Sequence, residues 1–433
     1  MKQAFLICGN HGILMHQITP KKRPMIRHQS YFDTLGSMQE DSASWRAVFA
    51  GLSVLRLVDA YMDSGSSVDP ANWAQLHSVR TAIEAVGEGD PVRGVLTNVL
   101  EEVTTRRKID DTVSASLLAY GRALDYQAAW GLAIDVFSTV AKLTAPERNP
   151  KLAVEVHVAV GGAARRNGDW EISARAYSQA AYIADTLGDR QGVLTVQVGI
   201  ANTYMAKGNL PQAQTILDDV LVQARDQELQ EVQAIALHSR AALATHKGDH
   251  SEGIKLAHEA LTLTTNPTDR DLVLDDIAGM FTLLGLRDAA RDSHLVLAAT
   301  AQSKMVRASA TINLMELAAV DGMAEAFDSY ARELANARLS PWTRAHYLLF
   351  LGEGMSLLGR REASEDALKE TISFADANQI HQVSFRAQSA LSAVRSAARP
   401  DKSFVAPPTW VPEEVSTVAR AMSELRKTAV AAA

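Results

Sequence analysis

Glycines at a regular spacing constrain this chain more than any other feature of its sequence. Six of them form one series, at intervals of forty and then thirty-seven residues: Gly168, Gly208, Gly248, Gly285, Gly322 and Gly359. A fixed period of this length is typical of repeat proteins, in which each unit packs only against its neighbours. Glycine readily adopts the left-handed conformation that ends many helices. The spacing therefore predicts stacked pairs of helices, with a glycine in the turn inside each pair.

A second series, of mostly small residues, precedes these turns by seven positions. It consists of Gly121, Gly161, Ala201, Ala241, Ala278, Met315 and Gly352. Five positions after the first three glycine turns, the residues are small as well: Ser173, Ala213 and Gly253. Two antiparallel helices approach closely only where small side chains lie between their axes. We therefore expect the two helices of each unit to cross at these positions.

The unit around Gly208 carries the fullest pattern. Its residues are Ile200, Ala201, Tyr204, Gly208, Asn209, Ala213 and Leu217. In this it resembles the tetratricopeptide repeat (TPR) family, whose motif has a small residue at position 8, an aromatic near 11, Gly-Asp or Gly-Asn at 15 and 16, and Ala at 20. The resemblance implies an all-α fold, a TPR-like right-handed superhelical solenoid of antiparallel helix pairs. The units exceed the family's usual 34 residues, so their helices or links must be longer.

The repeats are expected to fill most of the chain. We predict seven hairpins within residues 114–380, with turns near Ala128 and at the six glycines, inside an array that spans residues 114–398. Residues 40–113 should form an N-terminal helical segment with room for one degenerate repeat.

Both ends of the chain differ from the repeats. Residues 1–39 hold five basic residues against one acid and develop no apolar helical period. We expect a disordered basic tail there, or a start codon placed upstream of Met38. Three prolines predict an extended connector over residues 399–411, and a C-terminal helix should follow within residues 412–433.

Charge and composition exclude several classes of partner. The formal net charge of −7 opposes attachment to nucleic acid or to anionic lipid, and no helix-turn-helix motif is recognisable. No apolar run approaches the roughly 20 residues that a membrane helix needs. The single cysteine, Cys8, cannot form an intramolecular disulfide. We therefore expect a soluble cytoplasmic protein that binds neither nucleic acid nor membrane.

Sequence signatures of catalysis are missing. There is no P-loop, no dinucleotide-binding glycine turn, no nucleophile elbow and no zincin motif. His246 and His250 are four residues apart, but the turn at Gly248 separates them, so they are not expected to share a zinc ion. Cys8, His11 and His16 lack a fourth ligand at a suitable spacing. We expect no enzymatic activity, cofactor or metal.

The resemblance also indicates a binding surface. In the TPR family, positions 2, 5, 9 and 12 of the first helix share one face, which lines the concave groove. The partner-binding residues this selects are Arg122, Val158, Arg165, Val198, Asn202, Met205, Ile235 and His238, with Gly162, Thr195, Ala242 and Thr245 beside them. We expect the Asn202 amide to hold a peptide backbone. Glu316 and Glu353, at position 9 of later units, should make the C-terminal groove more acidic.

Two functions fit these features. The first is a scaffold or adaptor that binds a protein or peptide in the concave groove. The alternative is a regulator of the bacterial peptide-sensing kind, which the chain resembles in architecture alone. Residues 42–106 would then be the output module, and ligand binding would change the pitch of the superhelix. The identity of the partner and the oligomeric state stay open.

Overall fold

Helices provide all the regular secondary structure in the computed structural model, which describes residues 26–63, 72–106, 108–396 and 409–432. Twenty helices and no strands lie within these ranges. The first four are α1 (Gln29–Ser37), α2 (Ala43–Asp63), α3 (Asn72–Glu84) and α4 (Pro91–Arg106). Within the same ranges, no helix is long and apolar enough to cross a membrane.

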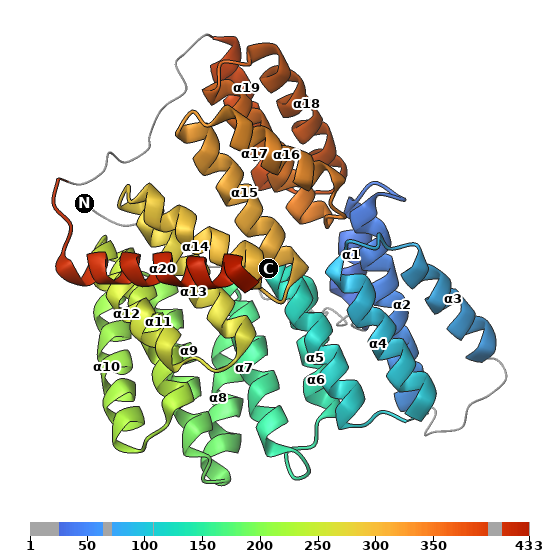
Figure 1. Ribbon diagram of the computed structural model, residues 1–433. Helices are drawn as coiled ribbons and strands as arrows, with labels where there is room; N and C mark the ends of the chain where they lie inside the picture. The colour runs from blue at the N-terminus through green and yellow to red at the C-terminus, as the bar shows by residue number, and fades with distance from the viewer. Residues whose placement is uncertain (1–25, 64–71, 107, 397–408, 433) are drawn as a thin grey trace, which may run out of the picture.

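Seven antiparallel helix pairs follow along the chain (Figure 1). They are α5 (Asp111–Tyr126) with α6 (Trp130–Leu143), α7 (Pro150–Asn167) with α8 (Trp170–Thr186), α9 (Arg190–Ala206) with α10 (Leu210–Asp226), α11 (Gln230–His246) with α12 (His250–Leu263), α13 (Pro267–Leu283) with α14 (Arg287–Thr300), α15 (Lys304–Val320) with α16 (Ala324–Asn336), and α17 (Pro341–Leu357) with α18 (Arg361–Ala377). Helix α19 (His381–Arg395) packs on α18. The predicted all-α, TPR-like solenoid of helix pairs is confirmed.

The turns inside the pairs lie where the glycine series places them. Ala128 and the six glycines all have a positive φ, between 58° and 82°. Such angles favour glycine, because a Cβ atom is strained there. In two of the six turns the residue after the glycine caps the next helix. Asn209 Oδ1 accepts a hydrogen bond from the backbone N–H of Gln212 at 3.3 Å, and Asp249 Oδ1 accepts one from the backbone N–H of Glu252 at 3.1 Å. The Gly-Asn pair therefore ends one helix and begins the next.

Close helix crossings explain the series of small residues. A Cβ atom added at Gly121 would lie 2.3 Å from the ring of Phe137, and one at Gly161 would lie 2.8 Å from the ring of Tyr177. Ser173 also donates a hydrogen bond from its hydroxyl to the Gly161 carbonyl at 2.9 Å. The aromatic ring of the second helix thus occupies the space that a larger residue would need in the first.

The expectation of a disordered tail is wrong for the part that forms α1. Tyr31 is fully buried, and its hydroxyl lies 2.9 Å from that of Tyr120 on α5. His28 lies between Asp135, at 2.7 Å, and Asp59, at 3.2 Å. A search for a periodic apolar face misses this segment, because one aromatic and one histidine anchor it. Residues 1–25 lie outside the described ranges.

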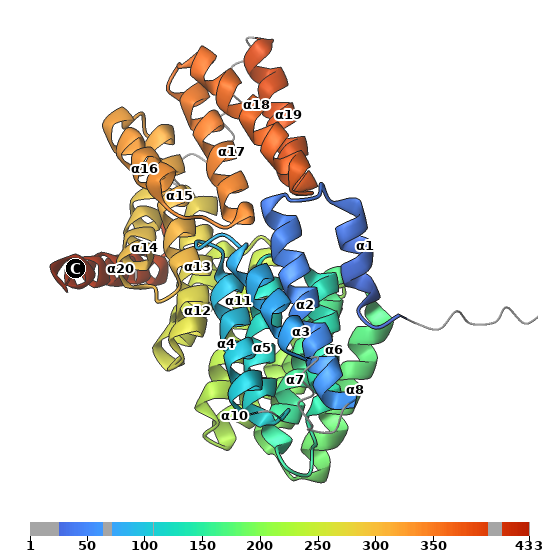
Figure 2. The same cartoon turned by 90° about the vertical axis from the view of Figure 1, so that its right-hand side faces the viewer.

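The N-terminal helices contact the last repeats as well as the first. The backbone N–H of Ser44 donates to Asn378 Oδ1 at 3.2 Å, and Glu88 pairs with Arg338. Figure 2 shows α1 and α2 directly beside the ends of α18 and α19. The last repeats of the solenoid therefore return to its own N-terminal segment.

Helix α20 (Glu413–Ala432) leaves the repeat order and crosses α12 and α14. Val415, Val418 and Met422 are buried there, and Arg426 pairs with Asp292 at 3.2 Å. Most of the expected proline-rich connector, residues 399–408, lies outside the described part of the chain. In Figure 1, α20 is the red helix that lies across the second helices of the central units.

Candidate functional site

The first helices of the pairs supply the faces that we call the wall. It consists of the faces of α5, α7, α9, α11, α13, α15 and α17 that carry positions 2, 5, 9 and 12 of the repeat. We call the stretch from α5 to α11 the paired half of the wall, and the stretch from α13 to α17 the acidic half. The two halves share one repeat register but differ in whether their charged side chains form ion pairs with a neighbouring unit.

In the paired half, polar side chains bind the neighbouring unit. Arg122 on α5 pairs with Glu155 on α7. Asn202 on α9 donates a hydrogen bond from Nδ2 to Ser239 Oγ on α11 at 3.2 Å. His238 Nε2 lies 2.6 Å from Asp276 Oδ2 on α13. Three of the residues predicted to bind a partner are thus already engaged between units.

The remaining predicted residues differ in their exposure. Val198 and Met205 are buried, with 2% and 9% of their surface exposed, so they offer little area to a ligand. Val158 is half-buried and Ile235 is 38% exposed. Arg165 has no hydrogen-bond partner for its buried Nε among the described residues, and burial lowers the pKa of its guanidinium. An arginine remains charged at physiological pH all the same.

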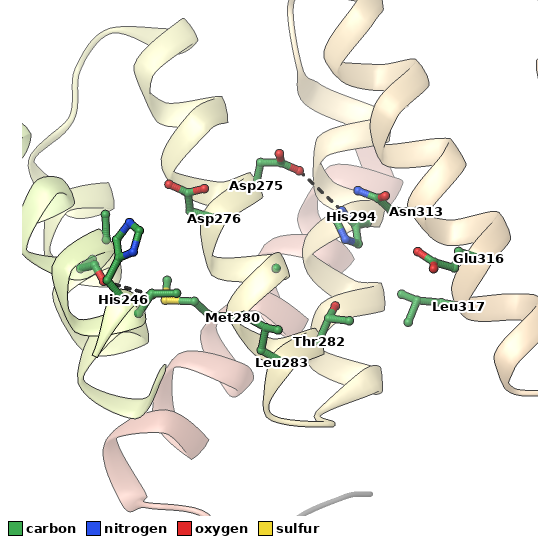
Figure 3. Close-up of a pocket in the computed structure, with 14 residues that line it drawn as sticks. His246, Asp275, Asp276, Met280, Thr282, Leu283, His294, Asn313, Glu316 and Leu317 are labelled. Atoms are coloured by element: carbon green, nitrogen blue, oxygen red, sulfur yellow. Dashed lines mark hydrogen bonds and ion pairs between the residues drawn. The ribbon is translucent and has the colours of Figure 1, made fainter. Parts of the chain in front are cut away.

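A pocket of about 560 Å³ lies mainly in the acidic half, with one edge formed by α11 of the paired half. Helices α11, α13, α14 and α15 contribute its lining, and Figure 3 shows the side chains. The polar groups are His246, Asp275, Asp276, His294, Asn313 and Glu316. Met280, Leu283 and Leu317 supply apolar surface. A concave site with apolar walls and a few convergent polar groups is typical of ligand-binding pockets.

Two carboxylates of this pocket lack a cationic partner. Burial, together with the nearby charge of Asp276, raises the pKa of Asp275 to about 6. Burial also raises the pKa of Glu316 to about 7; Glu353 acts in the same direction and Arg386 opposes it. Arg386 binds Glu353 at 2.6 Å, and no described Lys or Arg lies within 4 Å of Asp275 or Glu316. These carboxyl groups therefore lose hydration without gaining a direct ion pair with a Lys or Arg.

His294 lies beside them with one ring nitrogen unsatisfied. Its side chain is 4% exposed, and Nδ1 has no hydrogen-bond partner within the described part of the chain. The distance from Nδ1 to Asp275 Oδ1 is 4.0 Å, too long for a hydrogen bond. Burial lowers the pKa of His294 to about 4, so the ring is neutral at pH 7. A neutral imidazole can donate one hydrogen bond and accept another.

Tyr126, at the end of α5, lies near enough to α13 for the charges of its acids to act on it. Burial raises its pKa to about 12, and the charges of Asp275 and Asp271 on α13 add to this effect. Helices α5 and α13 belong to units four apart, so their proximity shows that the wall curves back toward itself. The pocket therefore lies on the concave side of the solenoid.

Sequence reasoning found part of this site. Asp275 occupies position 5 and Glu316 position 9 of their units, so the register identifies both, although the predicted groove includes only Glu316 and the neighbouring acids Asp275 and Asp276 suggest solvated surface from the sequence alone. His294 lies on a second helix, outside the register of the first helices, and no sequence pattern links Tyr126 to Asp275. Among the described residues, no group of three or more His, Cys, Asp or Glu side chains could hold a metal ion.

Comparison with known proteins identifies similar structures but no family. No family model matches the sequence, and no curated protein does. Several solved structures are similar to the chain, among them the following three. NprR in complex with its cognate peptide NprX has 14% identity and a TM-score of 0.40, over 75% of this chain and 98% of NprR. Rap protein complexed with competence and sporulation factor has 14% identity and a TM-score of 0.31, over 81% and 98%. The TPR domain of P58(IPK) has 16% identity and a TM-score of 0.21, over 86% and 98%.

Proposed function

We propose that this protein is a non-catalytic scaffold or adaptor that binds a peptide or a segment of a partner protein along the concave wall. The observation that carries the proposal is the pocket in this wall, where the buried Nδ1 of His294 has no partner in the described structure. In the paired half of the wall, Asn202 Oδ1 and Arg165 Nε are likewise buried without a hydrogen-bond partner among the described residues. A buried polar group without a partner costs about 1–3 kcal/mol, so a ligand that supplies partners would recover that free energy.

An extended peptide suits the arrangement of these groups. Its backbone offers N–H and C=O groups at regular intervals, and the Asn202 amide can bind such groups through its free oxygen. Val158 and Ile235 present apolar surface on either side. Arg122 and His238 are held by Glu155 and Asp276, so they would shape the groove and contribute less binding energy.

Peptide selection followed by a matched pair of variants tests this function. Phage that display random seven-residue peptides are selected on the immobilised native protein, and the best binder is synthesised. Arg165→Ala with Asn202→Ala should weaken its binding by about 1–3 kcal/mol, because two buried contacts are lost. The control, Arg175→Ala with Gln179→Ala, removes the same chemical groups from exposed positions on α8 and should leave affinity unchanged. Equal losses in both variants, or no selected peptide at all, would refute the proposal.

The regulator is a second candidate, and the contacts between the two ends of the solenoid favour it. Ser44 and Glu88, in the segment 42–106, contact Asn378 and Arg338 of the last repeats. A change of superhelix pitch on peptide binding would alter these contacts directly. Distance measurement between spin labels at positions 46 and 379 checks this candidate. A distance that shifts on adding the selected peptide supports the regulator, and an unchanged distance supports a rigid scaffold.

A further inference from the structure

We propose that the pocket of the acidic half binds an organic cation carried by the peptide ligand: the guanidinium or ammonium group of an Arg or Lys side chain, or a free amino terminus. This inference rests on the proposed function and specifies the chemistry of the ligand. It follows from the cluster of acids at Asp275, Asp276 and Glu316, together with the unsatisfied nitrogen of His294.

The charges around the pocket are unbalanced. Asp276 is engaged by His238, and Arg386 is engaged by Glu353, which leaves Asp275 and Glu316 without a Lys or Arg partner within 4 Å among the described residues. Arg386 acts on Glu316 only from a longer distance. The paired half shows the contrasting case, because Asp125 there binds Arg166 from the next unit. A cation from the ligand would do for the acidic half what Arg166 does for Asp125. Desolvated carboxylates attract such a group more strongly than carboxylates in water.

The neutral groups of the pocket match a cation with several donors. Figure 3 shows His294 and Asn313 between the carboxylates of Asp275 and Glu316. Since Nδ1 of His294 is unpartnered in the described structure, it can accept a hydrogen bond when the proton is on Nε2. Asn313 offers an amide oxygen. A guanidinium group has five N–H donors in a plane, which two carboxylates, an imidazole and an amide can together satisfy.

Protons compete with such a ligand. In the empty pocket, burial raises the pKa of Glu316 to about 7 and that of Asp275 to about 6. A bound cation favours the ionised carboxylates, so binding should release protons and weaken as the pH falls from 8 to 5.5. The other charged or titratable groups that face these two are Asp276, Asp271, His238, His246, His294, Tyr126, Glu353 and Arg386.

The test uses the heptapeptide selected on the native protein. If the peptide contains arginine, citrulline replaces it, which keeps the shape of the side chain and removes its charge. If the peptide contains lysine, the side-chain amine is acetylated. In a separate arm of the experiment, the amino terminus of the peptide is acetylated. One of these changes should weaken binding to the native protein by about 10- to 100-fold. Which arm shows the loss identifies the source of the cation. The same change should alter binding by less than about 3-fold in the Asp275→Asn, Glu316→Gln variant.

A matched control removes two negative charges elsewhere. Asp366→Asn with Glu370→Gln lies on the exposed face of α18 and should retain the full discrimination between charged and neutral peptides. If peptides depend on Arg165 and Asn202 but all neutralised forms bind the native protein equally, the cation pocket is wrong and the proposed function stands. If no selected peptide depends on those two residues, both are wrong. Thermal melts of each variant verify that it is folded.

Discussion

The two halves of the wall differ in whether the acids at their wall positions have a cationic partner. In the paired half, an acid of one unit meets an arginine of the next, as Asp125 meets Arg166. In the acidic half, Asp275 and Glu316 occupy wall positions with no described cation within 4 Å. A wall position therefore joins two units when the neighbouring unit supplies the counter-charge, and it is available to a ligand when none is supplied.

This difference has an energetic side. The ion pairs of the paired half are partly exposed, and such pairs contribute only about 0–1 kcal/mol each. The raised pKa values of Asp275 and Glu316 mean that ionising them destabilises the folded state. Binding sites commonly retain such unfavourable arrangements because the ligand relieves them. Stability measurements on the free protein can therefore distinguish the halves.

The largest predicted loss of stability comes from enlarging a residue at a helix crossing. It should be equal in the two halves, because both have the same kind of crossing. Ala201, in the paired half, and Ala278, in the acidic half, are fully buried at position 8. Leucine at either position should reduce the free energy of unfolding by about 1–3 kcal/mol, since the crossing cannot accommodate three more carbon atoms. Urea denaturation of Ala201→Leu and Ala278→Leu measures this. A loss in one variant alone would show that the scaffold itself differs between the halves.

The second largest predicted change in stability is a gain from neutralising a buried acid, and it should appear only in the acidic half. Glu316→Gln should stabilise the free protein by about 1–2 kcal/mol at pH 8, because it removes a carboxylate that is costly to ionise where it is buried. The folded-state pKa of about 7 lies above the ordinary value of 4.5, so the cost develops as the pH rises from 4.5 to 7. The gain should nearly vanish at pH 4.5. Unfolding curves at both pH values decide this, and an equal gain at both would contradict the electrostatic explanation.

A weaker form of the same effect is expected at Asp275. Its pKa of about 6 is closer to the ordinary value of 3.8, and 44% of its side chain is exposed, so solvent screens the charge. Asp275→Asn should stabilise by about 0.5–1 kcal/mol at pH 8, with the cost of the native carboxylate developing between pH 3.8 and 6. Thermal melts over that range are the measurement. A destabilised variant would indicate a counter-charge that the structure does not show.

The smallest change in the free energy of unfolding is expected in the paired half, where removing an acid should destabilise the protein and not stabilise it. Asp125→Asn leaves Arg166 without its partner, so it should destabilise by about 0–1 kcal/mol. Salt screens an exposed ion pair, so the difference from the native protein should shrink in 0.5 M sodium chloride. Melts at low and high salt test this. Stabilisation by this substitution would remove the distinction between the halves.

The register of the repeat made much of the fold predictable. Positive φ angles and close crossings depend on local residue types, so Gly168 and Gly161 could be placed from the sequence alone. The docking of α1 could not, because it depends on Tyr31 reaching a partner 89 residues away. The same limit applies to the site. Position 9 identifies Glu316. The lack of an ion pair at Glu316 and the proximity of Tyr126 depend instead on the rotation between successive helix pairs of the superhelix, which the sequence does not give.

The most direct test of the difference between the halves is the ionisation of Glu316 in the free and bound protein. Carbon-13 labelling of glutamate carboxyl groups allows it to be followed by NMR, with Glu316→Gln identifying its signal. We expect a pKa of about 7 in the free protein. Saturation with the cationic peptide should lower that pKa by about 1–3 units, the usual effect of an opposite charge nearby. A free-protein value near the ordinary 4.5, or no change on saturation, would contradict the account.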